Sequence, residues 1–276
     1  MRVDSHVHHW SLRRGDYGWL RPDMHSIYRD FGAADFDPLR RAAHIDRVIL
    51  VQAAATIEET AYLMTLARRS AYVMGVVGWL DFDDPDAAQL THAAARDLRL
   101  LGLRPMIQDI DDDRWMLSGV LDPMLQSMAA HGLVFDALVR ERHLPHLYTL
   151  ALRHSDVSFV IDHAAKPNMT PLGFAGWQAP IARCASLPNV HCKLSGLLTE
   201  LAPAQNVEDL ERFVRHLVDS FGTERLLWGS DWPVLNLASD YQTWLDLSRT
   251  LLASLSSEAQ DGIFGDNALA LYERAA

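Results

Sequence analysis

Two histidines near the start of the chain, His6 and His8, are separated by one residue within the predicted first strand, Arg2–His8. Residues i and i+2 of a β-strand project from the same face, so a strand here would direct both imidazoles to one side. Two imidazoles at a strand end can ligate a metal ion or orient a carbonyl group. The chain holds 13 histidines, so this pair indicates a site only if polar groups from other strands reach the same place.

Polar side chains of the required kinds do follow other apolar runs. His163 comes after Phe159–Asp162, and Asp231 comes after Leu226–Gly229. A carboxylate such as Asp231 can take a proton from water, and imidazoles can stabilise negative charge on a carbonyl oxygen. Further candidates for substrate contacts lie at or beside predicted strand ends and in the first long loop: Arg104, Gln108, Lys166, Trp79, His25 and Trp232.

Short apolar runs alternate with longer amphipathic segments along the whole chain. The predicted strands are Arg2–His8, Arg47–Gln52, Val73–Trp79, Gly102–Ile107, Leu133–Ala137, Phe159–Asp162, Val190–Leu194 and Leu226–Gly229. The predicted helices are Thr56–Ser70, Pro85–Arg99, Gly119–His131, Leu144–His154, Trp177–Leu187, Val207–Phe221 (with Asn206 as cap), Tyr241–Ser254 and Asn267–Arg274. The segment from His9 to about His44 is too long for an ordinary connection, and it predicts a functional loop over the end of the first strand.

Eight strands followed by helices indicate a parallel α/β architecture, and a (β/α)8 TIM barrel fits both their number and the length of 276 residues. A doubly wound open sheet usually has a glycine-rich turn after its first strand, whereas this chain has His-Val-His-His-Trp. Residues 1–276 are therefore expected to form one domain. In a barrel the active site lies at the carboxyl ends of the strands, where the polar candidates fall. Lys193, inside a buried strand, should have a carboxylate partner or face the barrel mouth.

Composition narrows the possible partners. The formal net charge of −11 argues against nucleic acid or an anionic membrane surface as a partner. The two cysteines, Cys184 and Cys192, suit a reducing compartment, and the sequence has no apolar run of membrane-spanning length. We therefore expect a cytoplasmic protein that acts on a small molecule, with a homo-oligomer left open.

The motifs together resemble the amidohydrolase superfamily. They are His6-Val7-His8, Asp162-His163-Ala164-Ala165-Lys166-Pro167, Cys192-Lys193-Leu194-Ser195-Gly196 and Gly229-Ser230-Asp231-Trp232-Pro233. More narrowly, the chain resembles the branch of sugar-lactone hydrolases that includes L-fuconolactonase and 2-pyrone-4,6-dicarboxylate hydrolase. The resemblance covers the whole chain and implies a distorted (β/α)8 barrel that hydrolyses a small carbohydrate-derived lactone.

The resemblance also implies roles for individual residues. Asp231 would act as general base on a water molecule, while His6, His8 and His163 would polarise the carbonyl, directly or through one divalent metal ion. Two imidazole nitrogens with a carboxylate suit zinc or manganese; the metal ligands would then be His6, His8, His163 and Asp231. Arg104 occupies the fourth strand, where a two-metal site would need a bridging lysine, so binuclear chemistry is disfavoured.

Three alternatives stay open at this stage. The site could work without metal, with protonated histidines bearing the negative charge of the oxyanion. The chain could be a metal-dependent decarboxylase of the same superfamily, or a non-catalytic barrel that binds a sugar acid. The fourth strand also departs from fuconolactonase-like sequences, which carry a further Arg-His pair there, so the particular sugar is not specified.

Overall fold

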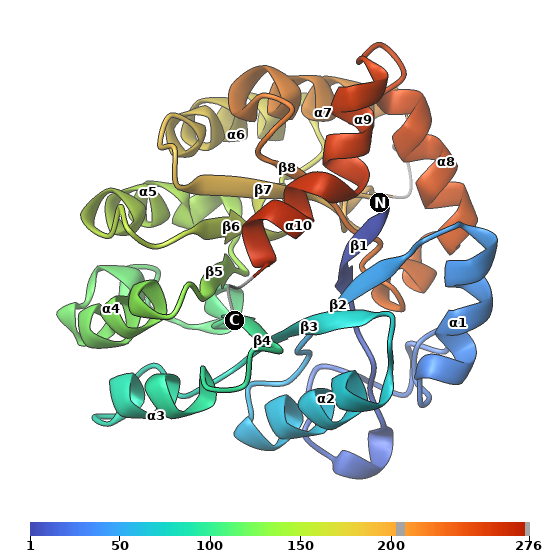
Figure 1. Cartoon of the computed structure of the whole chain (residues 1–276). Coiled ribbons are helices and arrows are strands. Elements are labelled where there is room, and N and C mark those ends of the chain that lie inside the picture. The colour runs from blue at the N-terminus through green and yellow to red at the C-terminus, as the bar shows by residue number, and fades with distance from the viewer. Residues whose placement is uncertain (203–207, 274–276) are drawn as a thin grey trace.

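The computed structural model describes residues 1–202 and 208–273. Within these ranges, eight parallel strands form one sheet in the order β1 to β8. A parallel bridge between Val7 and Trp232, which follows the eighth strand, brings the two edges of the sheet together. Figure 1 shows the helices surrounding the strands. The predicted (β/α)8 barrel is confirmed.

The strands are short and the helices follow them along the chain. The strands are β1 (Val3–Val7), β2 (Arg47–Val51), β3 (Val73–Gly78), β4 (Leu100–Leu103), β5 (Val134–Ala137), β6 (Phe159–Ile161), β7 (Val190–Leu194) and β8 (Leu226–Trp228). The helices are α1 (Ala33–Ala42), α2 (Ile57–Arg69), α3 (Ala87–Ala94), α4 (Asp122–Ala130), α5 (Leu144–Arg153), α6 (Pro171–Ala185), α7 (Glu208–Phe221), α8 (Tyr241–Leu251), α9 (Ser257–Asp261) and α10 (Asn267–Tyr272).

Apolar side chains fill one end of the barrel. Val3, Val77 and Val160 belong to this buried cluster, which also takes in Tyr272 from α10. Figure 1 shows α10 lying across one end of the barrel. Branched residues that project inward from several strands pack this end solidly, so the polar residues that reach the interior do so toward the other end.

The structure corrects several predicted element boundaries. The segment from His9 to about His44 contains helix α1, which the sequence did not reveal because Phe36 is its one fully buried residue and a proline, Pro38, lies inside it. Strand β4 ends at Leu103 rather than Ile107, since Pro105 lacks the amide proton that a continuing strand needs. Helix α9 was also missed.

The predicted start of α6 is also wrong. Helix α6 begins at Pro171, six residues before its predicted start, with the Thr170 hydroxyl accepting a hydrogen bond from the Gly173 amide. The predicted cap Asn206, the predicted start Val207 and the predicted end Arg274 lie outside the described residues. Among the helices that the structure describes, none combines the length and hydrophobicity required to cross a membrane.

The long segment after β1 is fastened to the turn that follows β2. The indole nitrogen of Trp19 donates a hydrogen bond of 2.7 Å to the Ala53 carbonyl. The Ala53 and Ala54 amides in turn donate to the buried carboxylate of Glu59, near the start of α2. Burial raises the pKa of Glu59 from 4.5 to about 7. This carboxylate therefore holds the turn against which the segment rests.

We expect the contribution of Glu59 to stability to depend on pH. A carboxyl group whose pKa is higher in the folded state stabilises the fold most below pH 4.5, and this contribution is lost as pH rises toward 7. Glu59→Gln does not titrate and keeps an oxygen that can accept from both amides. The wild type should therefore lose about 2–3 kcal/mol relative to Glu59→Gln between pH 5 and pH 8.

Urea unfolding of both proteins at the two pH values measures this difference. Glu58→Gln is the matched control, because Glu58 is the exposed neighbour on the same helix. A stability difference between the wild type and Glu59→Gln that stays constant with pH would contradict the expected titration.

Candidate active site

The closing seam of the barrel brings β1 against the residues that follow β8. The Asp231 amide donates a 2.9 Å hydrogen bond to the His6 carbonyl, and the His8 amide donates a 2.7 Å bond to the Trp232 carbonyl. His6 and His8 share one face of the first strand. The seam therefore places both imidazoles and the Asp231 carboxylate at the same end of the barrel.

A second carboxylate, that of Asp4, lies within this seam. Its Oδ1 accepts from the Ser230 amide at 2.8 Å and from the His6 amide at 3.2 Å, while Oδ2 accepts from the Tyr241 hydroxyl at 2.8 Å. Asp4 is fully buried, and burial raises its pKa to about 6 in spite of these hydrogen bonds. Asp4 therefore links the backbone of His6 to that of Ser230, the residue before Asp231.

His163 reaches the site from an unusual turn after β6. The residues from His163 to Lys166 have φ values of 53°, 51°, 63° and 50°, which lie in the left-handed region that non-glycine residues rarely adopt. Gly196 packs against this turn, and a Cβ atom there would lie 2.6 Å from His163 Nδ1. His163 Nδ1 instead lies 2.8 Å from Ser195 Oγ, which leaves Nε2 facing Asp231.

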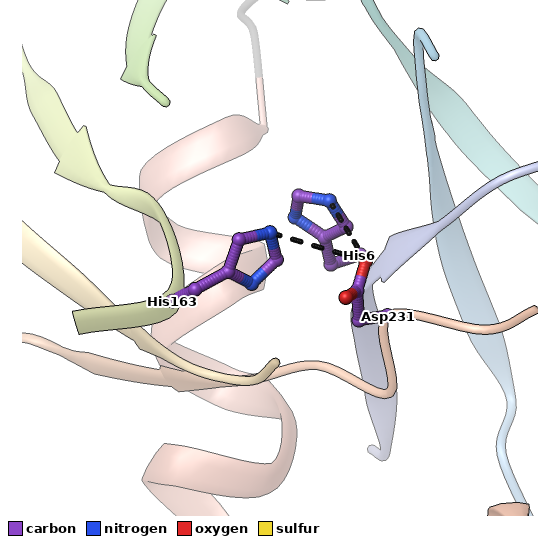
Figure 2. Close-up of side chains that lie close together, drawn as sticks. All are labelled: His6, His163 and Asp231. Carbon is purple, nitrogen blue, oxygen red and sulfur yellow. Dashed lines mark ion pairs between the residues drawn. The ribbon is translucent and has the colours of Figure 1, made fainter. Parts of the chain in front are cut away.

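The ring nitrogens of the histidines converge on one oxygen of Asp231. Its Oδ1 lies 3.2 Å from His8 Nε2, 3.7 Å from His6 Nε2 and 3.9 Å from His163 Nε2. Figure 2 shows His6 and His163 directed at this carboxylate from separate parts of the barrel. The structure therefore brings together all four residues that the sequence placed at the centre of the site.

The buried position of the site controls its protonation states. Burial lowers the pKa of His6 well below 6.5 and that of His163 to about 4, so both imidazoles are neutral near pH 7. Burial would raise the pKa of Asp231, but the facing imidazoles of His163, His8 and His6 lower it below the usual range for an aspartate. Asp231 is therefore an ionised acceptor that faces the neutral imidazoles of His6 and His163.

This donor set fits one divalent metal ion. His6, His163 and Asp231 each offer one atom, and these atoms lie within 4.8 Å of one another. A tetrahedral zinc ion with bonds of about 2.0–2.1 Å separates its ligand atoms by about 3.4 Å, close to the distances around Asp231 Oδ1. His8 does not belong to this group of three possible ligands. Its Nδ1 lies 2.8 Å from the Val51 carbonyl, and its Nε2 faces Asp231 at 3.2 Å.

A network of buried charges lies beneath the histidines. Lys193 Nζ contacts Asp136 Oδ2, lies 3.1 Å from Asp162 Oδ1 and lies 3.3 Å from His6 Nδ1. Burial disfavours the charged ammonium, but the carboxylates of Asp136 and Asp162 raise the pKa of Lys193 above its usual value. The prediction that Lys193 has a carboxylate partner is confirmed.

Arg104 extends this network toward the barrel mouth. Its NH1 lies 3.1 Å from Asp162 Oδ2 and 3.3 Å from His6 Nε2, and its NH2 donates to the Gln52 carbonyl. At the opposite end the Tyr272 hydroxyl donates a 2.6 Å hydrogen bond to Asp136 Oδ1. Buried ionic groups therefore hold His6 in place from below and from the side.

A cavity of about 190 Å³ opens above these groups. Its lining includes His8, His163, Asp231 and the candidate substrate residues Arg104, Gln108 and Lys166. The structure does not bring the other three candidates to this lining. His25 is exposed, Trp79 is partly buried outside the cavity, and Trp232 is 2% exposed and packs against Phe31 and Phe36 in the core.

Trp19 forms part of the wall, in agreement with its place among the tryptophans that the sequence positions at a substrate pocket. Other lining residues were not selected from the sequence. Ala53, Met106 and Leu138 also line the cavity as ordinary residues just beyond strand ends. Asp162 and Asp136 were visible as strand-end carboxylates, but their pairing with Lys193 depends on barrel geometry that local patterns do not encode.

Comparison with known proteins gives independent information on this site. The family model described as amidohydrolase matches residues 3–274. An L-fucono-1,5-lactonase of Burkholderia ambifaria is 42% identical over 275 residues, covering 98% of this chain and 95% of that protein. An L-fucono-1,5-lactonase of Burkholderia multivorans is 35% identical over 284 residues, with 99% and 96% covered. The crystal structure of a Burkholderia multivorans amidohydrolase with bound zinc is 34% identical and gives a TM-score of 0.94, with both chains fully covered.

We expect Lys193→Met to destabilise the fold strongly. The substitution keeps most of the side-chain volume but leaves Asp136 without a buried counter-ion and Asp162 with Arg104 alone. Breaking a buried ion pair in this way typically costs about 3–5 kcal/mol. The free energy of unfolding, measured by urea denaturation, should fall by that amount.

Lys166→Met is the matched control for Lys193→Met. Lys166 is partly exposed at the cavity, and its loss should change stability by no more than about 0.5 kcal/mol. Equal stability losses in the two variants would show that the buried network does not stabilise the fold.

Proposed function

The chain belongs to the amidohydrolase family, and we propose that it hydrolyses the cyclic ester of a small carbohydrate-derived lactone, releasing the sugar acid. The convergence of three imidazoles on the Asp231 carboxylate carries this proposal; Asp231, His8 and His163 line the cavity, and His6 lies buried behind them. The names of the two Burkholderia relatives support the substrate class. The family membership itself confirms the resemblance expected from the motifs.

Asp231 is the group best placed to activate water. Its carboxylate lines the cavity and is ionised, so it can accept a proton from a water molecule that attacks the lactone carbonyl. A carboxylate with a low pKa holds a proton weakly. His8 Nε2 lies 3.2 Å from Asp231 Oδ1 and has a free lone pair because His8 Nδ1 donates to the Val51 carbonyl, so His8 offers the proton a second acceptor from which it can reach the leaving alkoxide.

His6, His8 and His163 would stabilise the negative charge that develops on the carbonyl oxygen. Their rings are held before substrate arrives: His8 by the Val51 carbonyl, His163 by Ser195 and His6 by the Lys193 network. Fixed dipoles in a buried site stabilise such a charge without having to reorganise. We further propose that His6, His163 and Asp231, with His8 alongside, hold one zinc- or manganese-like ion. When bound, this ion would polarise the carbonyl and acidify the attacking water.

Arg104, Gln108 and Lys166 would bind the hydroxyl groups of the substrate. Arg104 Nε and Gln108 Oε1 are buried and have no hydrogen-bond partner among the described residues. Unpaired buried donors and acceptors are costly, and a ligand rich in hydroxyl groups would pair with them. Trp19 adds an aromatic wall that suits the apolar face of a sugar ring.

A panel of sugar-derived 1,4- and 1,5-lactones, assayed by a pH indicator with and without a chelator, tests the proposal. We expect acid release with at least one lactone. Loss of the rate in chelator, and its recovery on adding zinc or manganese, would support the metal ion. Carbon dioxide release from an aromatic or unsaturated acid without lactone opening would instead identify a decarboxylase. Tight sugar-acid binding without any turnover would identify a non-catalytic barrel.

We expect Asp231→Asn to lower kcat for the hydrolysed lactone by about 10²-fold or more. The amide keeps the shape of the side chain but cannot accept a proton from water, and general-base catalysis typically contributes 10²–10⁴-fold. Initial rates for the two purified proteins measure the effect. Asp109→Asn is the matched control, because Asp109 is another carboxylate on the cavity wall. Full activity of Asp231→Asn would remove Asp231 from the proposed role.

Gly196→Ala should impair catalysis by displacing His163. The added Cβ would meet the imidazole at 2.6 Å, and alanine is strained at a φ of 63°. We expect kcat to fall by about tenfold or more, since small displacements of catalytic groups are costly. Gly176→Ala is the control, because a Cβ at Gly176 on α6 meets nothing within 4 Å. Unchanged kcat in Gly196→Ala would mean that the position of His163 does not matter.

A further inference from the structure

A second cavity, of about 690 Å³, lies on the outer side of the barrel next to the residues that follow β1. Its walls come from α1, from the end of α2 and from the start of β3. His9 lines this cavity, whereas its neighbour His8 lines the catalytic cavity. Successive residues of an extended strand point to opposite sides, so the two cavities lie back to back across the residues that follow β1.

His9 is the most unusual group in this second cavity. The side chain is 2% exposed, and its Nε2 atom is buried without a hydrogen-bond partner in the part of the chain that the structure describes. The hydroxyl groups of Ser70 and Tyr72 line the same cavity and hydrogen-bond to each other. Buried polar atoms normally have partners, so the unpaired Nε2 atom of His9 beside this hydroxyl pair indicates a polar ligand.

The charge of the lining indicates an anion. Arg40 and Arg41 both pair with Asp37, at 2.7 Å and 2.8 Å, so one carboxylate serves two guanidinium groups. Arg69 also lines the cavity and makes no ion pair with any described residue. This local excess of positive charge occurs in a chain whose net charge is −11.

The start of α1 adds backbone donors to the same lining. Ala33 and Ala34, the first residues of this ten-residue helix, line the cavity. The first amides of a helix have no acceptor within the helix, and the helix dipole favours negative charge at this end. Apolar groups such as Leu66 and Pro38 complete the walls and suit a carbon skeleton.

We propose that this second cavity is a binding site for a small hydroxycarboxylate anion. Arg69 and the start of α1 would bind the carboxylate, while His9, Ser70 and Tyr72 would bind hydroxyl groups. The sugar acid that the active site would release belongs to this chemical class; that link rests on the proposed function, whereas the binding site does not. His9 also packs edge-on against Trp232, with ring centroids 6.1 Å apart, so a bound anion would lie close to the residue that follows Asp231.

Calorimetric titration with sodium gluconate as the probe tests the site in the full-length protein. We expect Arg69→Glu to weaken gluconate binding by about tenfold or more, since it replaces a charge-assisted contact with repulsion. Arg68→Glu is the matched control, because Arg68 is the adjacent arginine on α2, pairs with Asp97 and lies outside this cavity. It should change the dissociation constant by less than about twofold.

Lys166→Ala separates the second cavity from the catalytic one. Binding that survives Lys166→Ala and Arg68→Glu but is lost in Arg69→Glu supports the proposal. Binding that is lost in Lys166→Ala and kept in Arg69→Glu would overturn it, because the anion would then occupy the catalytic cavity. Absence of binding to the wild type at millimolar gluconate would overturn it as well.

A second measurement tests whether His9 itself faces the ligand. In ¹⁵N-labelled protein, the imidazole signal that His9→Gln removes should shift on addition of gluconate, and it should not shift in Arg69→Glu. A signal that stays unchanged at saturating gluconate would contradict the proposed contact. Neither measurement depends on lactone turnover, so a failed lactone screen would leave this result intact.

Discussion

The site depends most on the hydrogen bonds that the buried carboxylate of Asp4 accepts. It accepts hydrogen bonds from the amide of His6 on the first strand and from that of Ser230 after the last strand. A barrel has no free edge once its first and last strands meet, so this carboxylate lies where the fold closes. Because the closure also determines where His6 and Asp231 stand, closing the barrel and building the site are one structural event. The free energy that stabilises the fold thereby also positions the site.

The interior of the barrel divides into an apolar part and an ionic part. Valine side chains and Tyr272 fill the end covered by α10, whereas Lys193, Asp136 and Asp162 lie between them and the histidines. Isolated buried charges would be expensive, but here each has a partner of opposite sign, and the Tyr272 hydroxyl adds a neutral hydrogen bond. Such a network contributes little net stability compared with apolar packing. The network instead positions the site, because its contacts limit where the His6 ring can lie.

The sequence predicted those features that depend on local pattern. Buried parallel strands are short apolar runs, and in a barrel their carboxyl ends must share one mouth, so His163 and Asp231 could be placed together without coordinates. Helix α1 could not be found in this way, since it buries a single side chain fully and therefore lacks an apolar period. Trp19 and His25 lie in the same long segment, and only the tertiary fold determines that Trp19 reaches the cavity while His25 stays exposed. Long-range pairing of charges, as at Lys193, is similarly absent from local sequence.

The left-handed turn that carries His163 shows how strain and geometry are balanced at the site. Each non-glycine residue in this conformation costs about 1 kcal/mol or more, and the turn has four in succession. A regular continuation of β6 would avoid that cost but would not give the chain this abrupt change of direction after Asp162. Burial of Ala164 and Ala165, together with the 2.8 Å contact between His163 and Ser195, offsets the strain. The close approach of Gly196 then leaves the imidazole little room to move, so the strained backbone yields a fixed ring rather than a mobile one.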